Sequence, residues 1–498
     1  MLAKGILKRT DMIGCTLCED APCSAACPKA DPGKALRHIW FDNEDIASLS
    51  IPEADICASC DAPCEKACVR PGKVRIKELM SVLSKEVRPR AEIPVPGDEN
   101  ALSCDLCGVP LENPFLLSSS VVASTYDMCA RSFEAGWAGA CFKTICSFDI
   151  HEASPRFSAI TGDNGAIIGF KNIEQLSDHS VAENMEIFRR LKDKYPSKFI
   201  LASIMGQNED EWGELSSLCE KNGADAVELN FSCPNMQEDG LGSDIGQVPE
   251  LVEKFTRIAK SAVSIPVLSK LTPNVANMSP AAEAAKKGGA DGIAAINTIK
   301  SITGVNPYTY VSDSPVRGKS AIGGYSGNAV KPIALRFISE LGQNENLKGL
   351  HISGMGGIET WRDALEFILL GSGSLQITTA VMQYGYRIID DLKAGLNYYL
   401  NQTGVKNVRD IIGAGLDFVS DTTDVLERDS ILFPKFNADK CIGCGRCYIS
   451  CMDGGHQAII FENRVPKLDG KKCVGCHLCK LVCPEGAIST AGKRILRS

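Results

Sequence analysis

The chain has 498 residues, 44% of them hydrophobic, with 23 cysteines and a formal net charge of −8. This length predicts two to four domains, and the acidic balance argues against nucleic acid as a partner. No apolar run approaches the length needed to cross a bilayer, and residues 1–11 lack the apolar core of a secretory signal. We therefore expect a cytoplasmic protein without a membrane partner, in a reducing compartment where thiolate-bound clusters persist.

Two four-cysteine sets come first, and each contains Asp-Ala-Pro-Cys, at residues 20–23 and 61–64. The repeat predicts an α-helical module over residues 1–95 with two 4Fe-4S clusters. We expect crossed ligation, in which each set gives its last cysteine to the other cluster. One cluster then takes Cys15, Cys18, Cys23 and Cys68, and the other takes Cys57, Cys60, Cys64 and Cys27. Zinc or disulfides are the alternative, but zinc sites usually need only paired cysteines and disulfides need a secreted chain.

Cys104 and Cys107 form an isolated C-x2-C pair before the next region. No second pair lies nearby in the sequence. We interpret the two cysteines as side chains of a hairpin, with a metal site as the alternative.

Residues 103–410 alternate short apolar runs with helix-length segments, which predicts an α/β fold, a closed parallel (β/α)8 TIM barrel. The eight candidate strands are residues 114–119, 139–144, 199–204, 226–232, 267–273, 292–297, 349–354 and 375–379. Catalytic groups of such barrels lie at the C-terminal strand ends. Polar residues lie near these ends, among them Ser118, Ser119, Lys143, Asn230, Lys270, Asn297 and Thr378.

The last two strands carry a phosphate-binding pattern. Ser-Gly-Met-Gly-Gly at residues 353–357 follows the seventh, and Thr378-Thr379 ends the eighth. Barrels commonly bind a phosphate at this place through backbone N–H groups. No Gly-x-Gly-x-x-Gly stands between a strand and a helix, so the sequence predicts FMN rather than a dinucleotide cofactor.

Cys233 follows the fourth strand on an amide-rich loop, where a thiol can exchange a proton with substrate carbon while a flavin handles the hydride. Most lone cysteines are buried structural residues instead, and that is our interpretation of Cys129, Cys141, Cys146 and Cys219. Lys143 and Lys270 are candidates for the cation that stabilises a reduced flavin, with surface charge as the alternative. We assign no catalytic role to the six histidines.

The last two cysteine sets form a ferredoxin repeat over residues 430–498, which predicts an α+β module with two further 4Fe-4S clusters. In this repeat three cysteines at two-residue spacing bind one cluster and the fourth reaches its neighbour. One cluster then takes Cys441, Cys444, Cys447 and Cys483, and the other takes Cys473, Cys476, Cys479 and Cys451.

These motifs together resemble the dihydropyrimidine dehydrogenases, most closely the barrel subunit of the bacterial NAD-dependent enzyme, over residues 103–490. The matching motifs include Phe-Lys-Thr at 142–144, Gly-Phe-Lys-Asn at 169–172, Asn-Phe-Ser-Cys-Pro at 230–234, Lys-Leu-Thr-Pro-Asn at 270–274 and Gly-Tyr-Ser-Gly at 324–327. The first 90 residues look like the cluster module that precedes the FAD domain in long dihydropyrimidine dehydrogenases and in the small subunit of glutamate synthase.

The resemblance implies reduction of uracil or thymine to the 5,6-dihydro form, with Cys233 as the general acid at pyrimidine C5. It implies substrate contacts from Asn172, Asn230, Phe231, Ser232, Asn297 and Thr298. It implies FMN contacts from Ser118, Ser119, Lys143, Thr144, Lys270, Gly327, Gly356, Gly357, Thr378 and Thr379.

The chain departs from the family pattern in two respects. Asn235 stands where the long enzymes have histidine, and asparagine is what dihydroorotate dehydrogenases show there. The N-terminal module also joins the barrel without FAD and NAD(P) domains between them, so electrons must come from a partner FAD/NAD(P)-binding subunit or a ferredoxin, and we expect an oligomer. The alternatives are a dihydroorotate dehydrogenase-type enzyme and an electron-transfer subunit with a non-catalytic barrel.

Overall fold

The computed structural model describes residues 7, 9–12, 14–51, 56–70, 74–86, 99–162, 166–234, 242–420, 423 and 425–496. The chain divides into two compact units, Met1–Val419 and Ser420–Ser498. None of the helices within the described ranges has the length and apolarity that a membrane crossing demands.

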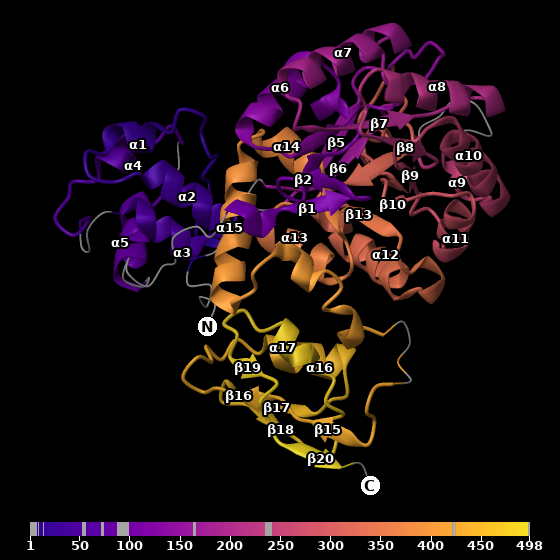
Figure 1. The fold of residues 1–498 in the computed structure, drawn as a ribbon. Helices are drawn as coiled ribbons and strands as arrows, with labels where there is room; N and C mark the ends of the chain where they lie inside the picture. Colours follow the sequence, from indigo (N-terminus) through magenta and orange to yellow (C-terminus); the bar gives the residue numbers. More distant parts are fainter. Residues whose placement is uncertain are drawn as a thin grey trace. The chain divides into compact units, whose positions relative to one another are not determined.

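The first unit contains a closed barrel of eight parallel strands in chain order (Figure 1). The strands are β3 (Phe115–Leu117), β4 (Gly139–Cys141), β7 (Phe199–Ile204), β8 (Ala226–Asn230), β9 (Val267–Lys270), β10 (Gly292–Ala295), β13 (His351–Met355) and β14 (Ser374–Ile377). Each overlaps one predicted strand, so the predicted barrel is confirmed. Nearly all of their residues are buried, as expected for a parallel sheet covered on both faces.

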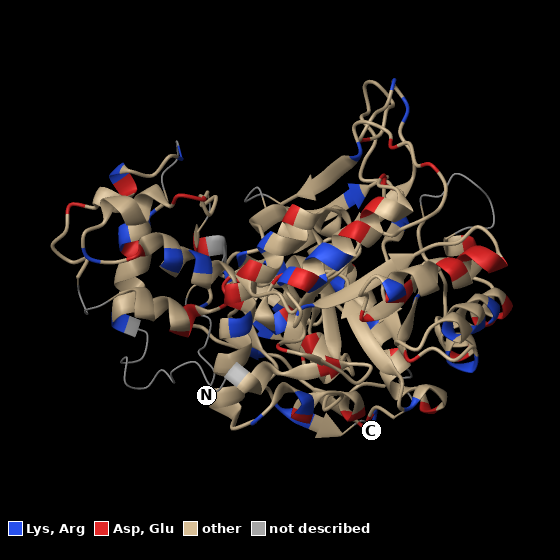
Figure 2. Ribbon diagram, turned by 45° about the horizontal axis from the view of Figure 1, so that its top comes forward, with Lys and Arg blue, Asp and Glu red and all other residues tan. Residues whose placement is uncertain are grey.

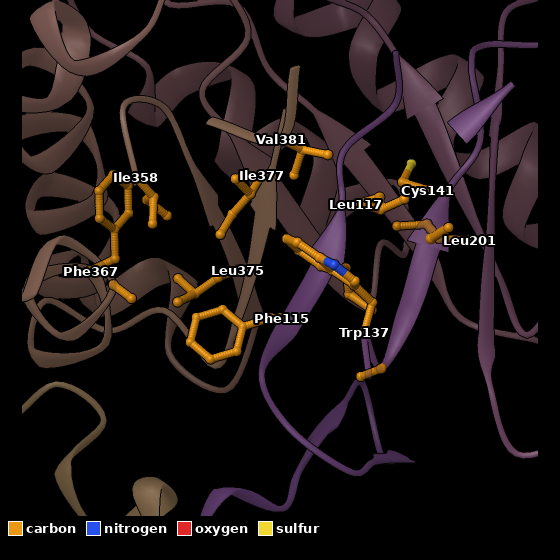
Figure 3. Packing of buried hydrophobic residues seen from close by; sticks show 14 of the residues in the cluster. Phe115, Leu117, Trp137, Cys141, Leu201, Ile358, Phe367, Leu375, Ile377 and Val381 are labelled. Carbon is orange, nitrogen blue, oxygen red and sulfur yellow. The ribbon is translucent and has the colours of Figure 1, made fainter. Parts of the chain in front are cut away.

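Helices surround the barrel and bury their apolar sides against its strands. They include α6 (Tyr126–Ala135), α7 (Val181–Lys194), α8 (Glu209–Lys221), α10 (Pro249–Ala262), α11 (Ser279–Lys287), α12 (Lys331–Gln343), α13 (Trp361–Leu369), α14 (Thr379–Tyr384) and α15 (Ile388–Thr403). Capping boxes at Ser180 and Thr360 begin α7 and α13. Phe115 and Leu375 from the barrel and Phe367 from α13 belong to this core (Figure 3).

A second, antiparallel sheet lies at the C-terminal ends of the barrel strands. Its order is β11 (Ile299–Ser301), β12 (Gly323–Ser326), β6 (Ile167–Asn172) and β5 (Phe157–Thr161). The buried Lys171 donates from Nζ to the carbonyl oxygens of Asp313 at 2.6 Å and Ala321 at 2.8 Å. Lys171 thereby ties the loop between β11 and β12 to the sheet.

The N-terminal module is helical, with α1 (Pro22–Ala26), α2 (Pro32–Trp40), α3 (Glu44–Ala47), α4 (Pro63–Lys66) and α5 (Ile76–Glu86). The repeated Asp-Ala-Pro-Cys has the same local structure twice. Ala21 and Ala62 are both left-handed, and each is followed by a short helix that begins with proline. The repeated motif therefore forms the same turn and short helix at two places in the chain.

Helix α2 docks on α15 of the barrel through the fully buried Asp391. Its carboxylate pairs with His38 Nδ1 and with Arg37 Nε, each at 2.9 Å, and its backbone carbonyl accepts from Asn43 Nδ2 at 2.9 Å. A buried charge with several partners fixes this contact in one geometry.

The second unit has a ferredoxin-like repeat of helices and short strand pairs. The helices are α16 (Arg446–Gly454) and α17 (Leu478–Leu481), and the pairs are β15 (Ser430–Leu432) with β20 (Arg494–Leu496), β16 (Lys435–Phe436) with β19 (Ile488–Ser489), and β17 (Ile459–Glu462) with β18 (Val465–Leu468). Its core contains Cys447, Cys479, Ile459 and Ile488.

Acidic and basic residues are interspersed along the outer helices of the barrel (Figure 2). Mixed signs of this kind are typical of a solvated surface.

Candidate functional site

A cavity of about 150 Å³, partly open to solvent, lies where the barrel strands end and the antiparallel sheet begins. Residues at or just after the C-terminal ends of β3, β4, β8, β9, β10, β13 and β14 line it, together with Phe157, Phe170, Asn172, Tyr325 and Ser326 from the second sheet. The cavity thus lies at the C-terminal face of the barrel, as the sequence predicts.

Four of the predicted substrate residues line this cavity, namely Asn172, Asn230, Asn297 and Thr298. Cys233 also lines it and is 6% exposed. Residues 235–241 lie outside the described part of the chain, and Asn235 is among them.

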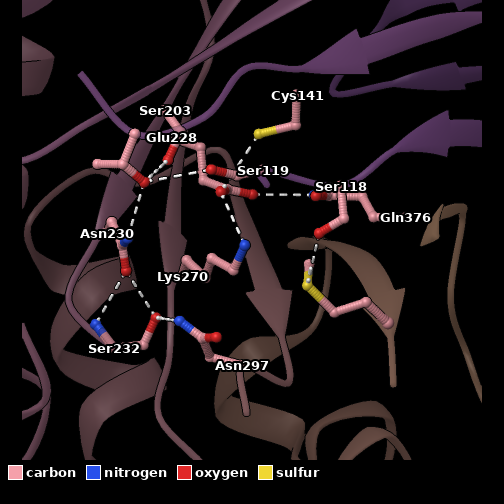
Figure 4. Close-up of polar contacts among 12 residues, drawn as sticks. Ser118, Ser119, Cys141, Ser203, Glu228, Asn230, Ser232, Lys270, Asn297 and Gln376 are labelled. Carbon is pink, nitrogen blue, oxygen red and sulfur yellow. Dashed lines mark hydrogen bonds and ion pairs between the residues drawn. The ribbon is translucent and has the colours of Figure 1, made fainter. Parts of the chain in front are cut away.

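Ser232 and Phe231 lie behind the wall of the cavity. Ser232 Oγ donates to Asn230 Oδ1 at 2.9 Å and accepts from Asn297 Nδ2 at 2.8 Å. Asn230 Nδ2 in turn donates to Thr144 Oγ1 at 2.8 Å, so one chain of hydrogen bonds orients both amides (Figure 4). Phe231 is fully buried and packs on Trp212, with ring centroids 5.1 Å apart.

All ten predicted FMN residues line the cavity. Lys270 Nζ pairs with the fully buried Glu228 at 3.2 Å. Lys143 Nζ pairs with Glu152 at 3.4 Å and with Glu174 at 3.9 Å. Burial raises the pKa of Glu174, although Lys143 acts in the opposite direction. Two lysines are among the described residues that line the cavity, and each of them pairs with a carboxylate.

Glycines allow two loops to meet at one side of the cavity. Gly327, Gly356 and Gly357 all have positive φ, and a Cβ on Gly357 would lie 2.8 Å from the backbone nitrogen of Lys331. Beside them Ser326 Oγ bonds Thr379 Oγ1 at 2.9 Å. The predicted glycine and threonine loops are thus adjacent.

Glu228 and Gln376 were not among the residues predicted for the site, and both are buried. Gln376 lines the cavity and donates from Nε2 to Glu228 Oε2 at 2.9 Å. The signal was available in the sequence. Each residue is polar, stands in an apolar strand, and precedes a predicted site residue by two positions, so it faces the barrel interior.

Three cavities are lined by cysteines in the predicted crossed sets. Cys15, Cys18, Cys23 and Cys68 line the first, Cys441, Cys444, Cys447 and Cys483 the second, and Cys451, Cys473, Cys476 and Cys479 the third. In the remaining set, burial raises the pKa of Cys64 to about 11, and the neighbouring Cys27 and Cys60 act in the same direction. No group of three or more His, Cys, Asp or Glu side chains in the described part of the chain has the arrangement of a metal-ion site.

The equivalent halves of the C-terminal repeat also match in detail. The backbone N–H of Ala458 bonds Cys451 Sγ at 3.3 Å, and that of Ala487 bonds Cys483 Sγ at 3.3 Å. These are the two cysteines that the crossed assignment gives to the other cluster.

Arg387, at the start of α15, connects the barrel to the first cysteine cavity. It lines that cavity and donates from Nη2 to the carbonyl oxygen of Leu17 at 2.7 Å. Met382, five positions earlier, lines the cavity at the barrel mouth.

The other cysteines have structural positions. Cys104 and Cys107 belong to a hairpin of β1 (Cys104–Leu106) and β2 (Val109–Leu111), as predicted. Cys129, Cys141, Cys146 and Cys219 are buried.

In comparisons with known proteins, the barrel and the C-terminal unit match separate families. A family model described as dihydroorotate dehydrogenase matches residues 101–400, and one described as a 4Fe-4S dicluster domain matches residues 435–490. The chain is 51% identical over 363 residues to the NAD-dependent dihydropyrimidine dehydrogenase subunit PreA of Escherichia coli strain K12, covering 73% of this chain and 88% of the relative.

More distant relatives carry two different activities in their names. The chloroplastic dihydropyrimidine dehydrogenase (NADP(+)) of Arabidopsis thaliana is 36% identical over 69% of this chain and 83% of its own length. The catalytic subunit of dihydroorotate dehydrogenase B (NAD(+)) of Pyrococcus abyssi is 36% identical over 63% of this chain and 99% of its own length. A crystal structure of DHODH from Eimeria tenella shares the fold, with a TM-score of 0.54 at 19% identity over 68% of this chain and 93% of that one.

Proposed function

This chain belongs to the dihydropyrimidine dehydrogenase family of oxidoreductases, and we propose that it reduces uracil or thymine to the 5,6-dihydropyrimidine. The observation that supports this most is the set of oriented amides around the cavity, with Asn230 and Asn297 held by Ser232. A pyrimidine ring presents amide edges, and each edge left unpaired in a dry site costs about 1–3 kcal/mol.

FMN is the cofactor that the cavity fits. Gln376 Oε1 is buried and has no hydrogen-bond partner among the described residues, so it can accept from the ring N–H of a flavin. Lys143, Lys270, Ser118, Ser119 and Thr144 would hold the ring system, and Gly327, Gly356, Gly357, Thr378 and Thr379 the phosphate. Bound FMN supplies the hydride for C6 of the pyrimidine.

Cys233 supplies the proton in this proposal. Its thiol lines the same cavity as the amides and donates to C5 as the ring is reduced, leaving a thiolate that solvent reprotonates. Asn230, Asn297 and Thr298 orient the ring so that C5 faces the sulfur atom.

The charges of the cavity favour a neutral pyrimidine over orotate. A substrate carboxylate in a buried site needs a cation that is not already neutralised. Lys143 and Lys270 both pair with carboxylates, at 3.4 Å to Glu152 and 3.2 Å to Glu228. The family model that matches residues 101–400 is described as dihydroorotate dehydrogenase, so dihydroorotate oxidation or reduction is the second candidate function.

The four cysteine sets would carry four 4Fe-4S clusters that relay electrons to FMN. The donor in this proposal is a partner FAD/NAD(P)-binding subunit or a ferredoxin, because the E. coli relative is named as a subunit of an NAD-dependent enzyme. Thiolate-bound clusters persist in a reducing compartment, which supports a cytoplasmic location in this proposal.

The test is anaerobic. The cluster-loaded full chain is reduced with dithionite, freed of excess reductant, and mixed separately with uracil, thymine and orotate, while flavin reoxidation and product are followed. We expect reoxidation and a dihydropyrimidine with uracil or thymine. Reoxidation by orotate alone would assign the second candidate, and no response to any of the three would favour an electron-transfer subunit.

A Cys233→Ala variant removes the proposed proton donor and leaves the residues proposed to bind FMN unchanged. We expect it to keep FMN and to lose turnover by 100-fold or more, on the order of a positioned acid's contribution. Unchanged turnover would remove Cys233 from the mechanism.

A further inference from the structure

Glu228 is a buried acid on β8 that no step of the proposed reaction uses. Its carboxylate accepts hydrogen bonds from Lys270 Nζ at 3.2 Å, from Cys141 Sγ at 3.3 Å and from Gln376 Nε2 at 2.9 Å (Figure 4). The side chain is fully buried, and Lys270 is only 3% exposed. These contacts join four strands, β4, β8, β9 and β14, at one carboxylate.

The strand register shows how Glu228 relates to the cavity. Asn230 pairs with Lys270 across β8 and β9, and Glu228 pairs with Leu268 two residues below. Glu228 therefore belongs to the layer beneath the cavity. Its neighbours Lys270 and Gln376 line the cavity, so the carboxylate acts on a bound molecule through them.

An isolated buried charge is strongly disfavoured, whereas a close opposite pair offsets much of that cost. Cys141 adds no opposing charge, because burial raises the pKa of its thiol well above the ordinary value, with Glu228 acting in the same direction. The charged groups of this hydrogen-bonded network are thus the ammonium of Lys270 and the carboxylate of Glu228.

We propose that Glu228 is a positioning residue that orients Lys270 and Gln376 and partly neutralises Lys270, and so sets the reduction potential of the flavin in this cavity. The inference rests on the proposed function, because it requires FMN at this place. Reduced flavin carries negative charge, which a nearby cation stabilises and a nearby anion destabilises. The charge balance of the pair therefore controls how readily the flavin accepts electrons.

Two neutralising substitutions should shift this potential in opposite directions. Glu228→Gln leaves the lysine charge unbalanced, so we expect a higher midpoint potential. Lys270→Met leaves the carboxylate unbalanced, so we expect a lower one. Each shift should be at least tenfold in the two-electron reduction equilibrium, which corresponds to about 30 mV. The double variant should return toward the wild-type potential.

Cys141→Ala is the matched control, because it removes a neutral donor to the same carboxylate and changes no charge. We expect its flavin potential to equal that of the wild type. A general loss of packing at this layer would lower stability in all variants without producing opposite shifts in potential.

The measurement is an anaerobic spectroelectrochemical titration of the flavin in the cluster-loaded full chain. Where Glu228→Gln alone fails to retain flavin, the double variant leaves no unpaired charge, and its potential should still exceed that of Lys270→Met. Shifts in the same direction, or equal potentials in the double variant and Lys270→Met, overturn the inference. Wild-type protein that binds no FMN overturns the proposed function instead.

Discussion

Single hydrogen-bonding residues behind the cavity fix the orientation of those that line it. Ser232 does not line the cavity, yet its hydroxyl joins the side chains of Asn230 and Asn297. The amides of asparagine can bind in two orientations that differ by a flip. The backbone N–H of Ser232, which can only donate, bonds Asn230 Oδ1 at 3.2 Å and so selects one orientation for Asn230. A residue without substrate contact thus determines which edge of a pyrimidine each amide can recognise.

His351, at the start of β13, gives a prediction for pH dependence. Burial lowers its pKa from 6.5 to about 4. Because the unfolded chain takes up the proton first, the stability contribution is fully present above pH 6.5 and is lost as pH falls to about 4. We expect the free energy of unfolding to drop by up to about 3 kcal/mol over this window because of His351.

The comparison variant is His351→Gln, which can keep a bond to Ser374 Oγ, now 2.9 Å from Nε2. Urea unfolding of both proteins should show a shallower loss of stability in the variant between pH 6.5 and pH 4. Parallel pH profiles would exclude His351 as the cause.

At the scale of elements, the charged contact between α2 and α15 is one of the contacts that hold the N-terminal module on the barrel. We expect Asp391→Asn to weaken this contact by about 3 kcal/mol, because His38 and Arg37 lose the carboxylate between them. Hydrogen exchange in α2 should accelerate while exchange in the barrel strands stays unchanged.

Asp390→Asn is the matched control. Asp390 is the next residue on α15, is 64% exposed in its side chain, and reaches Arg37 only at 3.9 Å. Exposed pairs of this kind contribute little, so its exchange profile should equal that of the wild type. Equal effects of both substitutions would mean that Asp391 is not the docking residue.

The sequence allowed prediction of the barrel strands but not of the second sheet. Barrel strands such as Phe199–Ile204 are continuous apolar runs, and their spacing by helices is regular. β5 is mostly exposed, and β11 and β12 are joined by a long loop held by Lys171, so neither periodicity nor spacing reveals them. Asn172 could be identified from its motif, whereas its position over the barrel mouth depends on this long-range pairing.

The alternation along its strand indicates that Glu228 faces the barrel interior, but its hydrogen-bond partners could not be predicted. Its neighbour Asn230 was recognised at a strand end, but the partners of Glu228 come from three other strands far away in the sequence. The hydrogen bonds of Glu228 join residues that are distant in the sequence, so local sequence patterns do not predict them.

At the scale of the whole molecule, the cluster ligation pattern can be tested by counting iron. If ligation is crossed, Cys15→Ala and Cys68→Ala damage the same cluster, so the double variant should lose about a quarter of the iron. Cys57→Ala with Cys68→Ala should lose about half. The reverse result would assign each cluster to one consecutive set, and full iron content in either variant would exclude these residues as ligands.

Arg387 has a consequence for how such a protein can be recombined. One short stretch of chain contributes Met382 to the barrel-mouth cavity and Arg387 to the cysteine cavity, where it bonds Leu17. The N-terminal module therefore cannot be joined to another barrel unless these contacts are kept. A grafted module must reproduce the backbone carbonyl that Arg387 binds, and a change of barrel must preserve the turn between α14 and α15.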